Sequence, residues 1–179
     1  MMKIAIAADH AGFQMKEALM LSYPTIEWVD LGTTSEESTD FPDYAFTLAM
    51  AVAGGHAERG ILLCATGVGM SMAANRHPMI RAALCSNNDI ARLARAHNDA
   101  NVLCLGAKYL SVEAAREIVD TFLNTPFSGV DRYVRRNNKL SLQDDGAGQG
   151  CCHGDGSCGQ GHDHAGHDHG GGCCGGGCS

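Results

Sequence analysis

The residues best suited to chemistry form a glycine-rich turn after an apolar run. Residues 64–71 read CATGVGMS, so a cysteine precedes a Gly-x-Gly turn and a helical segment. Such a turn exposes several backbone N–H groups at the positive end of a helix, which suits a phosphate or a developing oxyanion. The Lys-Ser/Thr ending of a nucleotide P-loop is missing. A tight strand-to-helix turn without function explains the spacing about equally well.

Three residues near the ends of apolar runs each have a structural and a chemical interpretation. Cys64 is either a small buried strand residue, the usual fate of a strand cysteine, or a thiolate stabilised at a helix N-terminus. Asp9 can cap the helix that follows it, but capping does not explain the adjacent His10.

Two later segments have the same ambiguity. His97-Asn98 fits a helix C-terminus, where histidine favours the helix dipole and asparagine tolerates a left-handed backbone, slightly better than it fits catalysis. Arg132 and Arg136 are four residues apart and share one helix face, as a phosphate clamp requires. A solvated basic face is the common alternative for such a run.

The elements that position these residues alternate between apolar runs and amphipathic segments. Apolar runs without polar alternation, each followed by a helix, predict a parallel sheet covered on both faces. The expected strands are 3–8, 26–31, 60–65, 80–85 and 101–105. The expected helices are 12–21, 43–53, 67–75, 89–96, 112–123 and a basic one near 129–140.

In an open α/β sheet the site lies beyond the carboxyl ends of the strands. Three turns with chemistry-bearing residues are expected at that edge. They are Asp9-His10, Cys64-Ala65-Thr66, and the turn before the fifth strand, His97-Asn98-Asp99.

Residues 144–179 differ in composition from the rest of the 179-residue chain. They hold 14 of the 23 glycines, six of the nine cysteines and five of the nine histidines, and no large apolar residue. Such a segment cannot bury enough surface to offset ~1–2 kcal/mol per residue of backbone ordering, which predicts a disordered tail. The sequence therefore predicts one domain, 1–143, followed by this tail.

The tail is rich in soft and borderline metal ligands. In a cytoplasmic chain this composition indicates metal binding rather than a disulfide framework, with Zn, Ni, Co or Cu(I) as suitable ions. No C-x₂-C pairs occur, which disfavours a fixed zinc ribbon. The alternatives are a low-complexity extension with incidental metal affinity, and a redox role for the adjacent cysteines. The candidate ligands are Cys151, Cys152, His153, Cys158, His162, His164, His167, His169, Cys173, Cys174 and Cys178.

Charge and hydropathy exclude other classes of protein. The formal net charge of −7 argues against a general nucleic-acid binder, which needs a basic face. The longest apolar runs are too short to span a bilayer, and the N-terminus becomes polar too early for a secretory signal. A cytoplasmic protein is expected.

Five motifs follow one another in a fixed order: DHAGFQMK, STDFPDYA, CATGVGMSMAANR, RLARAHNDANVLCLGAK and TPFSGVDRYVRR. Together, over roughly residues 2–142, they resemble the ribose-5-phosphate isomerase B family, which includes galactose-6-phosphate isomerase subunits. The resemblance implies a Rossmann-like three-layer α/β/α sandwich and an aldose–ketose isomerase that needs no metal or nucleotide cofactor. It also implies homodimers or tetramers with active sites shared between subunits.

The resemblance also assigns roles to residues. Cys64 matches the general base on the sugar carbon beside the carbonyl, and Thr66 the hydroxyl next to that base. His97 matches the acid/base that opens the sugar ring, with Asp9 at the opposite end of the ring, and Asn98 matches a ligand of a sugar hydroxyl.

Further matches concern the charged parts of the substrate. Some members use a glutamate as the base where this chain has Met70, which favours the cysteine version here. The backbone matching the anion hole for the enediolate belongs to Gly67, Val68, Gly69, Met70 and Ser71. The phosphate ligands are His10, Arg132 and Arg136, and Lys108 stands where some members carry a phosphate-binding arginine.

The chain departs from the family pattern at two positions. Ala65 replaces a common glycine, so an ordinary negative φ is expected there. Tyr133 follows Arg132 where histidine is frequent.

The leading function is the interconversion of ribose 5-phosphate and ribulose 5-phosphate through ring opening and an enediolate. One alternative is a hexose-6-phosphate isomerase acting on allose or galactose 6-phosphate, because one more carbon changes only the pocket depth. Another is a metal-sequestering protein on a retired isomerase scaffold, against which the intact Cys64, His97, Asp9 and arginine set argues. A flavodoxin-like nucleotide-binding module is disfavoured because phosphate-loop signatures are missing.

Overall fold

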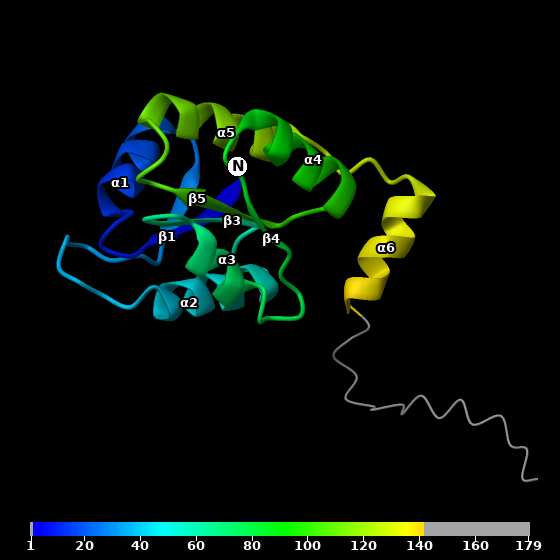
Figure 1. Ribbon diagram of the computed structural model, residues 1–179, viewed down its shortest axis with the longest axis horizontal. Helices are drawn as coiled ribbons and strands as arrows, with labels where there is room; N and C mark the ends of the chain where they lie inside the picture. The colour runs from blue at the N-terminus through cyan, green and yellow to red at the C-terminus, as the bar shows by residue number, and fades with distance from the viewer. Residues whose placement is uncertain (1, 142–179) are drawn as a thin grey trace, which may run out of the picture. The chain divides into compact units, whose positions relative to one another are not determined.

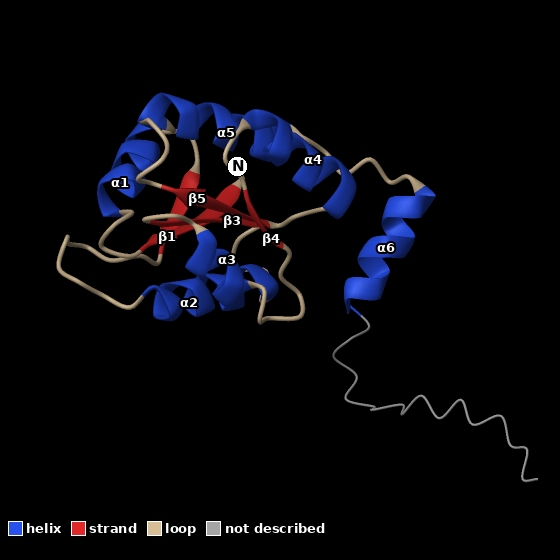
Figure 2. Cartoon of the chain, in the orientation of Figure 1, coloured by secondary structure: helices blue, strands red, loops and turns tan. Residues whose placement is uncertain are grey.

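The computed structural model describes residues 2–141, whose five strands form one parallel sheet with helices on both faces (Figures 1 and 2). The strands are β1 (Lys3–Ala8), β2 (Glu27–Asp30), β3 (Arg59–Cys64), β4 (Ala82–Leu84) and β5 (Val102–Gly106). The helices of this range are α1 (Phe13–Ser22), α2 (Phe41–Ala53), α3 (Val68–Ala74), α4 (Asn88–Asn98), α5 (Val112–Asn124) and α6 (Asp131–Ser141). The predicted α/β fold with a five-stranded parallel sheet is confirmed.

Each face of the sheet has its own core, because side chains alternate along every strand. In β1, Ile4 and Ile6 pack with α1, α4 and α5, whereas Ala5 and Ala7 pack with α2 and α3. Figure 1 shows these two groups of helices above and below the sheet. All four side chains are fully buried, which explains why β1 is an apolar run without polar alternation.

The strand order β2-β1-β3-β5-β4 contains a reversal next to β1. The chain leaves β1 for β2 on one side and then returns to β3 on the other side. Ala8 pairs with Leu63, so the turns that follow β1 and β3 begin side by side. Ligands of open α/β sheets bind in the crevice that such a reversal creates.

The bounds of some elements differ from the prediction. The outer strands β2 and β4 are shorter than the predicted 26–31 and 80–85, because each has a hydrogen-bonding neighbour on one side only. Helix α2 begins at Phe41 rather than at residue 43, since Asp40 is extended at the N-cap and Pro42 fits the first turn of a helix.

Helix α6 lies beside the layered part of the domain and packs against it chiefly through α4 (Figure 1). Asn137 Nδ2 donates to the carbonyl oxygen of His97 at 3.2 Å. Val130, which directly precedes the helix, is 44% exposed, and Val134 and Leu140 within it are 37% and 57% exposed. The helix is therefore an arm with uncovered apolar side chains.

No helix among residues 2–141 is long and apolar enough to cross a membrane. The predicted division after residue 143 and the predicted disordered tail, 144–179, lie outside the described residues.

Candidate active site

Cys64 is the last residue of β3, and its sulfur belongs to the turn that follows. Sγ accepts the backbone N–H of Gly67 at 3.1 Å, and the side chain is 6% exposed. Gly67 has φ +76°, and a Cβ there would lie 2.5 Å from Leu84 Cδ1 and 2.9 Å from the carbonyl carbon of Leu105. Glycine is therefore required at this point of the turn on two grounds, conformation and space.

The other described cysteines have different surroundings. Burial raises the pKa of Cys85 to about 12 and raises the pKa of Cys104 well above its usual value. Both are buried core thiols. Cys64 is also buried, but it ends a strand and has a backbone donor on its sulfur, which makes it the candidate for chemistry among the cysteines of residues 2–141.

The start of α3 continues the turn. Val68 N–H donates to Thr66 Oγ1 at 3.3 Å, and Ser71 Oγ donates to the Val68 carbonyl oxygen at 2.8 Å. The first N–H groups of any helix lack partners within the helix, and those of Gly69 and Met70 have none within α3. Within residues 67–71 these two amides remain to receive an oxyanion, because the N–H groups of Gly67, Val68 and Ser71 already have partners.

Ala65 and Lys108 join this turn to the end of β5. The Ala65 carbonyl oxygen accepts the backbone N–H of Lys108 at 3.1 Å. Lys108 is exposed at the same edge of the sheet. Among residues 2–141, Asp99 is the one non-glycine residue with positive φ, so the expectation of an ordinary φ at Ala65 is confirmed.

Asp9 and His10 lie in the neighbouring turn after β1. The Asp9 N–H donates to the Leu63 carbonyl oxygen, one residue before Cys64. Asp9 Oδ1 accepts the backbone N–H groups of Ala11 and Gly12 at 2.9 and 3.1 Å. Gly12, not Asp9, is the N-cap of α1, so the simple capping interpretation of Asp9 is wrong.

His10 is oriented by the segment that leads into α2. Its Nδ1 accepts the backbone N–H of Thr39 at 3.2 Å. In a neutral imidazole this contact assigns the proton to Nε2, which remains available as a donor. His10 can therefore donate to an anion while its other nitrogen is held by the backbone.

Lys16 is a residue of this region whose importance the sequence interpretation missed. It is 1% exposed, and its Nζ contacts Asp30 Oδ2 at 2.5 Å and the Thr33 carbonyl oxygen at 3.0 Å. These contacts join α1 to the end of β2 and to the segment that carries Thr39. A lysine between the buried Met15 and Leu19 on one helix is the signal that could have revealed it.

His97 and Asn98 lie at the opposite edge of the sheet. They end α4, and Asp99 then turns the chain with φ +47° into β5. Arg81, which precedes β4, donates Nε to the carbonyl oxygens of Asn98 and Asp99 at 3.2 and 2.9 Å. The expectation that this turn lies with the other two at the carboxyl edge is therefore wrong.

The correction follows from the direction of the strands. A turn that precedes a strand lies at the amino edge of a parallel sheet, whereas Cys64 follows a strand. Strand β3 has six residues, so the two edges are separated by roughly 16–20 Å. Within one chain, Cys64 and His97 do not meet.

Arg132 and Arg136 belong with His97. The Tyr133 ring stacks on the His97 imidazole with ring centroids 4.1 Å apart and planes 19° apart. Arg132 Nη2 donates to Tyr133 Oη at 3.0 Å, and Arg136 is exposed one turn further along α6. The candidate site residues thus fall into two groups: a Cys64 group (Asp9, His10, Cys64, Thr66, residues 67–71 and Lys108) and a His97 group (His97, Asn98, Arg132 and Arg136).

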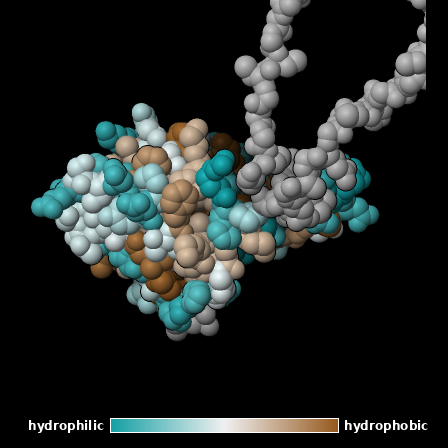
Figure 3. Space-filling view, turned by 90° about the horizontal axis from the view of Figure 1, so that it is seen from below, coloured by the Kyte–Doolittle hydropathy of each residue, from teal (hydrophilic) through white to brown (hydrophobic). Residues whose placement is uncertain are grey.

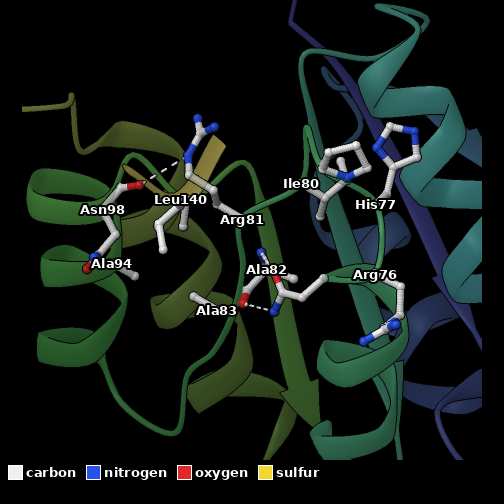
Figure 4. A pocket seen from close by; sticks show the side chains of 12 residues that line it. Arg76, His77, Ile80, Arg81, Ala82, Ala83, Ala94, Asn98 and Leu140 are labelled. Carbon is white, nitrogen blue, oxygen red and sulfur yellow. Dashed lines mark hydrogen bonds between the residues drawn. The ribbon is translucent and has the colours of Figure 1, made fainter. Parts of the chain in front are cut away.

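A cavity of about 600 Å³ lies beside the His97 group, between the end of α3, β4, α4 and α6. Figure 4 shows Asn98 and Leu140 on one wall and His77 and Ile80 on the other. Its lining includes Asn98 but no member of the Cys64 group. The cavity therefore adjoins the His97 group and not the Cys64 group.

Within residues 2–141, no three His, Cys, Asp or Glu side chains gather closely enough to hold a metal ion. The predicted ligands of the tail, from Cys151 to Cys178, lie outside the described residues.

Comparison with known proteins gives one consistent family. Residues 4–140 match the family model described as Ribose/Galactose Isomerase. Ribose-5-phosphate isomerase B of Escherichia coli is 47% identical over 131 residues, which are 72% of this chain and 88% of that protein.

Solved structures agree. A ribose 5-phosphate isomerase of Thermotoga maritima is 52% identical, with a TM-score of 0.76 over 78% of this chain and 97% of its own. The type B ribose 5-phosphate isomerase of Trypanosoma brucei is 47% identical, with the same TM-score and the same coverage. The match covers nearly the whole length of these proteins. The chain belongs to the ribose/galactose isomerase family.

Proposed function

We propose that the chain interconverts ribose 5-phosphate and ribulose 5-phosphate as an aldose–ketose isomerase. The observation that carries the proposal is the Cys64 sulfur, which ends a strand at the reversal of the sheet and accepts the Gly67 N–H at 3.1 Å. Relatives 47% and 52% identical are named as ribose-5-phosphate isomerases, which supports this choice of sugar.

The Cys64 group supplies the proton transfer. Once the sugar is open, the Cys64 thiolate removes the proton from C2 of the aldose. The hydroxyl proton moves from O2 to O1 beside Thr66, and Cys64 returns its proton to C1, which gives the ketose. The enediolate oxygen that carries negative charge between these steps accepts the N–H groups of Gly69 and Met70 at the start of α3.

The two groups share ring opening and phosphate binding. His97 exchanges a proton with the ring oxygen, Asp9 assists at the anomeric hydroxyl, and Asn98 binds a sugar hydroxyl. The phosphate is bound by Arg132, Arg136, Lys108 and the free Nε2 of His10. No cofactor takes part in this mechanism.

A complete site on this proposal combines the Cys64 group of one subunit with the His97 group of another. The separation of roughly 16–20 Å within one chain supports this arrangement. The exposed apolar side chains of the α6 arm also support it, because they need a covering surface. A two-fold dimer gives two identical shared sites, and pairing of dimers gives a tetramer.

The α2–α3 face offers further apolar contact area for such an assembly. Phe46 and Met50 of α2 and Val68 and Met72 of α3 are between 41% and 67% exposed. Figure 3, which views this side of the molecule, shows brown patches within a largely polar surface.

The test is an assay of the purified chain with four substrates: ribose 5-phosphate, ribulose 5-phosphate, allose 6-phosphate and galactose 6-phosphate. The proposal expects the highest kcat/KM for the pentose phosphates. A clear preference for either hexose phosphate would instead favour the hexose-6-phosphate alternative. Absence of turnover with all four sugars would favour a retired scaffold.

The segment after residue 143 is proposed to bind soft divalent metals in a cytoplasmic protein. The family match ends at residue 140, so these ligands lie beyond the matched part of the chain. Truncation after Gln143 is expected to preserve isomerisation and to abolish most zinc and nickel binding in a competition titration. If the full-length chain binds neither zinc nor nickel, the segment is better interpreted as a low-complexity extension without a metal-binding function.

A further inference from the structure

Tyr133 contacts both the ring-opening group and a phosphate-binding group of the proposed site. Its ring lies 4.1 Å from the His97 imidazole, measured between centroids, with the planes 19° apart. The guanidinium carbon of Arg132 lies 4.8 Å from the same ring centroid, and Arg132 Nη2 donates to Tyr133 Oη at 3.0 Å. One side chain on α6 therefore touches two functional groups from two helices.

We propose that Tyr133 is a positioning residue for the isomerase reaction. Its ring fixes the plane of the His97 imidazole, and its hydroxyl fixes the Arg132 guanidinium. The inference rests on the proposed function, because that function assigns ring opening to His97 and phosphate binding to Arg132.

The surroundings of His97 explain why a stacking partner matters there. His97 lies in the last turn of α4, where the helix ends and the chain reverses at Asp99. The contact from Asn137 reaches only the backbone carbonyl of His97. An imidazole attached through two rotatable bonds is oriented by what touches its ring, and Tyr133 stacks on that ring.

The identity of the residue at position 133 also has a consequence. A histidine at this position would place two ionisable imidazoles face to face. Two protonated rings in a stack would repel each other. A phenol ring gains no positive charge, so Tyr133 maintains the stack whichever protonation state His97 has during ring opening.

The effects of the Tyr133 ring and of the Tyr133 hydroxyl can be measured separately, since the ring contacts His97 and the hydroxyl contacts Arg132. Losing the hydroxyl removes one hydrogen bond to Arg132, which changes phosphate binding and hence KM. Losing the ring also frees His97, which slows ring opening and hence kcat for the cyclic aldose. Proton abstraction by Cys64 from ribulose 5-phosphate needs no ring opening, because this ketose is already open-chain.

The experiment compares Tyr133→Phe, Tyr133→Leu and the control Arg135→Ala, which removes an exposed side chain from the same helix. Tyr133→Phe is expected to raise KM for ribose 5-phosphate about fivefold with kcat unchanged. Tyr133→Leu is expected also to lower kcat about three- to tenfold. Exchange of deuterium from D₂O into C1 of saturating ribulose 5-phosphate is expected to stay at the wild-type rate in all three variants.

Two results would overturn the inference. Equal losses of isomerisation and deuterium exchange in Tyr133→Leu would indicate general damage, and unchanged kinetics in that variant would remove any role. Folding and oligomeric state are checked by circular dichroism and light scattering, and Tyr133→Phe keeps the ring should the leucine variant fail to fold.

A second measurement is independent of turnover. The ring current of Tyr133 shifts the His97 ring protons upfield, so their NMR signals are expected to move downfield in Tyr133→Leu and to stay in place in Arg135→Ala. Unshifted signals would contradict the stack. A wild-type chain that does not convert ribose 5-phosphate refutes the proposed function, whereas the NMR comparison still decides whether Tyr133 orients His97.

Discussion

The turn at Cys64 and the turn at His97 lie at opposite edges of the sheet and are held by different kinds of interaction. Backbone contacts hold the first, including the Gly67 N–H on the Cys64 sulfur. Charged side chains hold the second, where the Asp99 carboxylate contacts two guanidinium groups at 2.9 Å each.

Because the interactions differ, the two edges are expected to tolerate different kinds of amino-acid substitution. Backbone donors keep their charge and position when nearby side chains change, which suits the stabilisation of an oxyanion. The edge at His97 depends on Arg81 and Arg95, and Arg95 is 5% exposed with further contacts to the Ala100 and Thr125 carbonyl oxygens. Substitutions that remove the charge of Arg81, Arg95 or Asp99 are therefore expected to disturb the His97 edge and to leave the Gly67 contact on the Cys64 sulfur in place.

The largest expected effect concerns the Cys64 edge. Cys64→Ala is expected to lower turnover by roughly 10²–10⁴, the usual loss on removal of a general base, while the fold is retained. Steady-state assays with ribose 5-phosphate measure it. Cys85→Ala is the matched control, because it removes a buried thiol whose pKa burial raises to about 12. Turnover near the wild-type rate in Cys64→Ala would assign this residue to the core.

A mixing experiment tests whether the two edges cooperate between subunits. Cys64→Ala and His97→Ala are expected to be nearly inactive alone. Co-refolding them forms half mixed dimers, each with one site that carries both lesions and one that carries neither, so about a quarter of the sites regain activity.

The control for this experiment mixes the folded mutants without refolding, which measures spontaneous exchange of subunits. If mixed dimers form but the isomerase activity does not rise above that of each mutant alone, each site uses residues of one chain only. That outcome would refute the shared site and leave the isomerase assignment intact.

A smaller effect is expected at the α6 arm, whose arginines are proposed to bind the phosphate. Arg132→Ala and Arg136→Ala are expected to raise KM about tenfold or more with kcat retained, because a charge-assisted contact made equally in the ground and transition states is uniform binding. Arg135→Ala on the same helix serves as the control. Wild-type KM values in both variants would show that these arginines do not bind the phosphate.

The smallest effect concerns stability at the amino edge. Asp99→Ala removes the carboxylate between Arg81 and Arg95 and is expected to lower the free energy of unfolding by roughly 1–3 kcal/mol. Asp99→Asn, which also tolerates the left-handed backbone, is expected to lose less. Urea titrations of both variants measure the difference, and an unchanged midpoint in Asp99→Ala would mean that the network contributes nothing.

Much of the fold could be predicted because its signals are local. The apolar run at residues 3–8 coincides with β1, and the Gly-x-Gly turn after Cys64 opens α3 as expected. The predicted lengths of β2 and β4 are too long. Each of these strands has one neighbouring strand, and this depends on the order of the sheet rather than on the local sequence.

The grouping of the site could not be predicted to the same extent. Asp9 and Cys64 were expected together because both follow strands, and they share an edge. His97 precedes a strand, and the rule for carboxyl ends does not apply to it. The stack of His97 on Tyr133 joins residues 36 apart in sequence and depends on how α6 packs against α4, for which the sequence offers no periodic signal.

The sparse packing of α6 has a consequence for how activity depends on dilution. The arm carries Arg132 and Tyr133, yet it contacts its own domain chiefly through α4 and leaves apolar side chains uncovered. If a second copy covers them, association is linked by mass action to the order of the arm. Dilution below the dissociation constant then abolishes catalysis while the sheet and its two cores stay folded, so the specific activity of this chain is a function of its concentration.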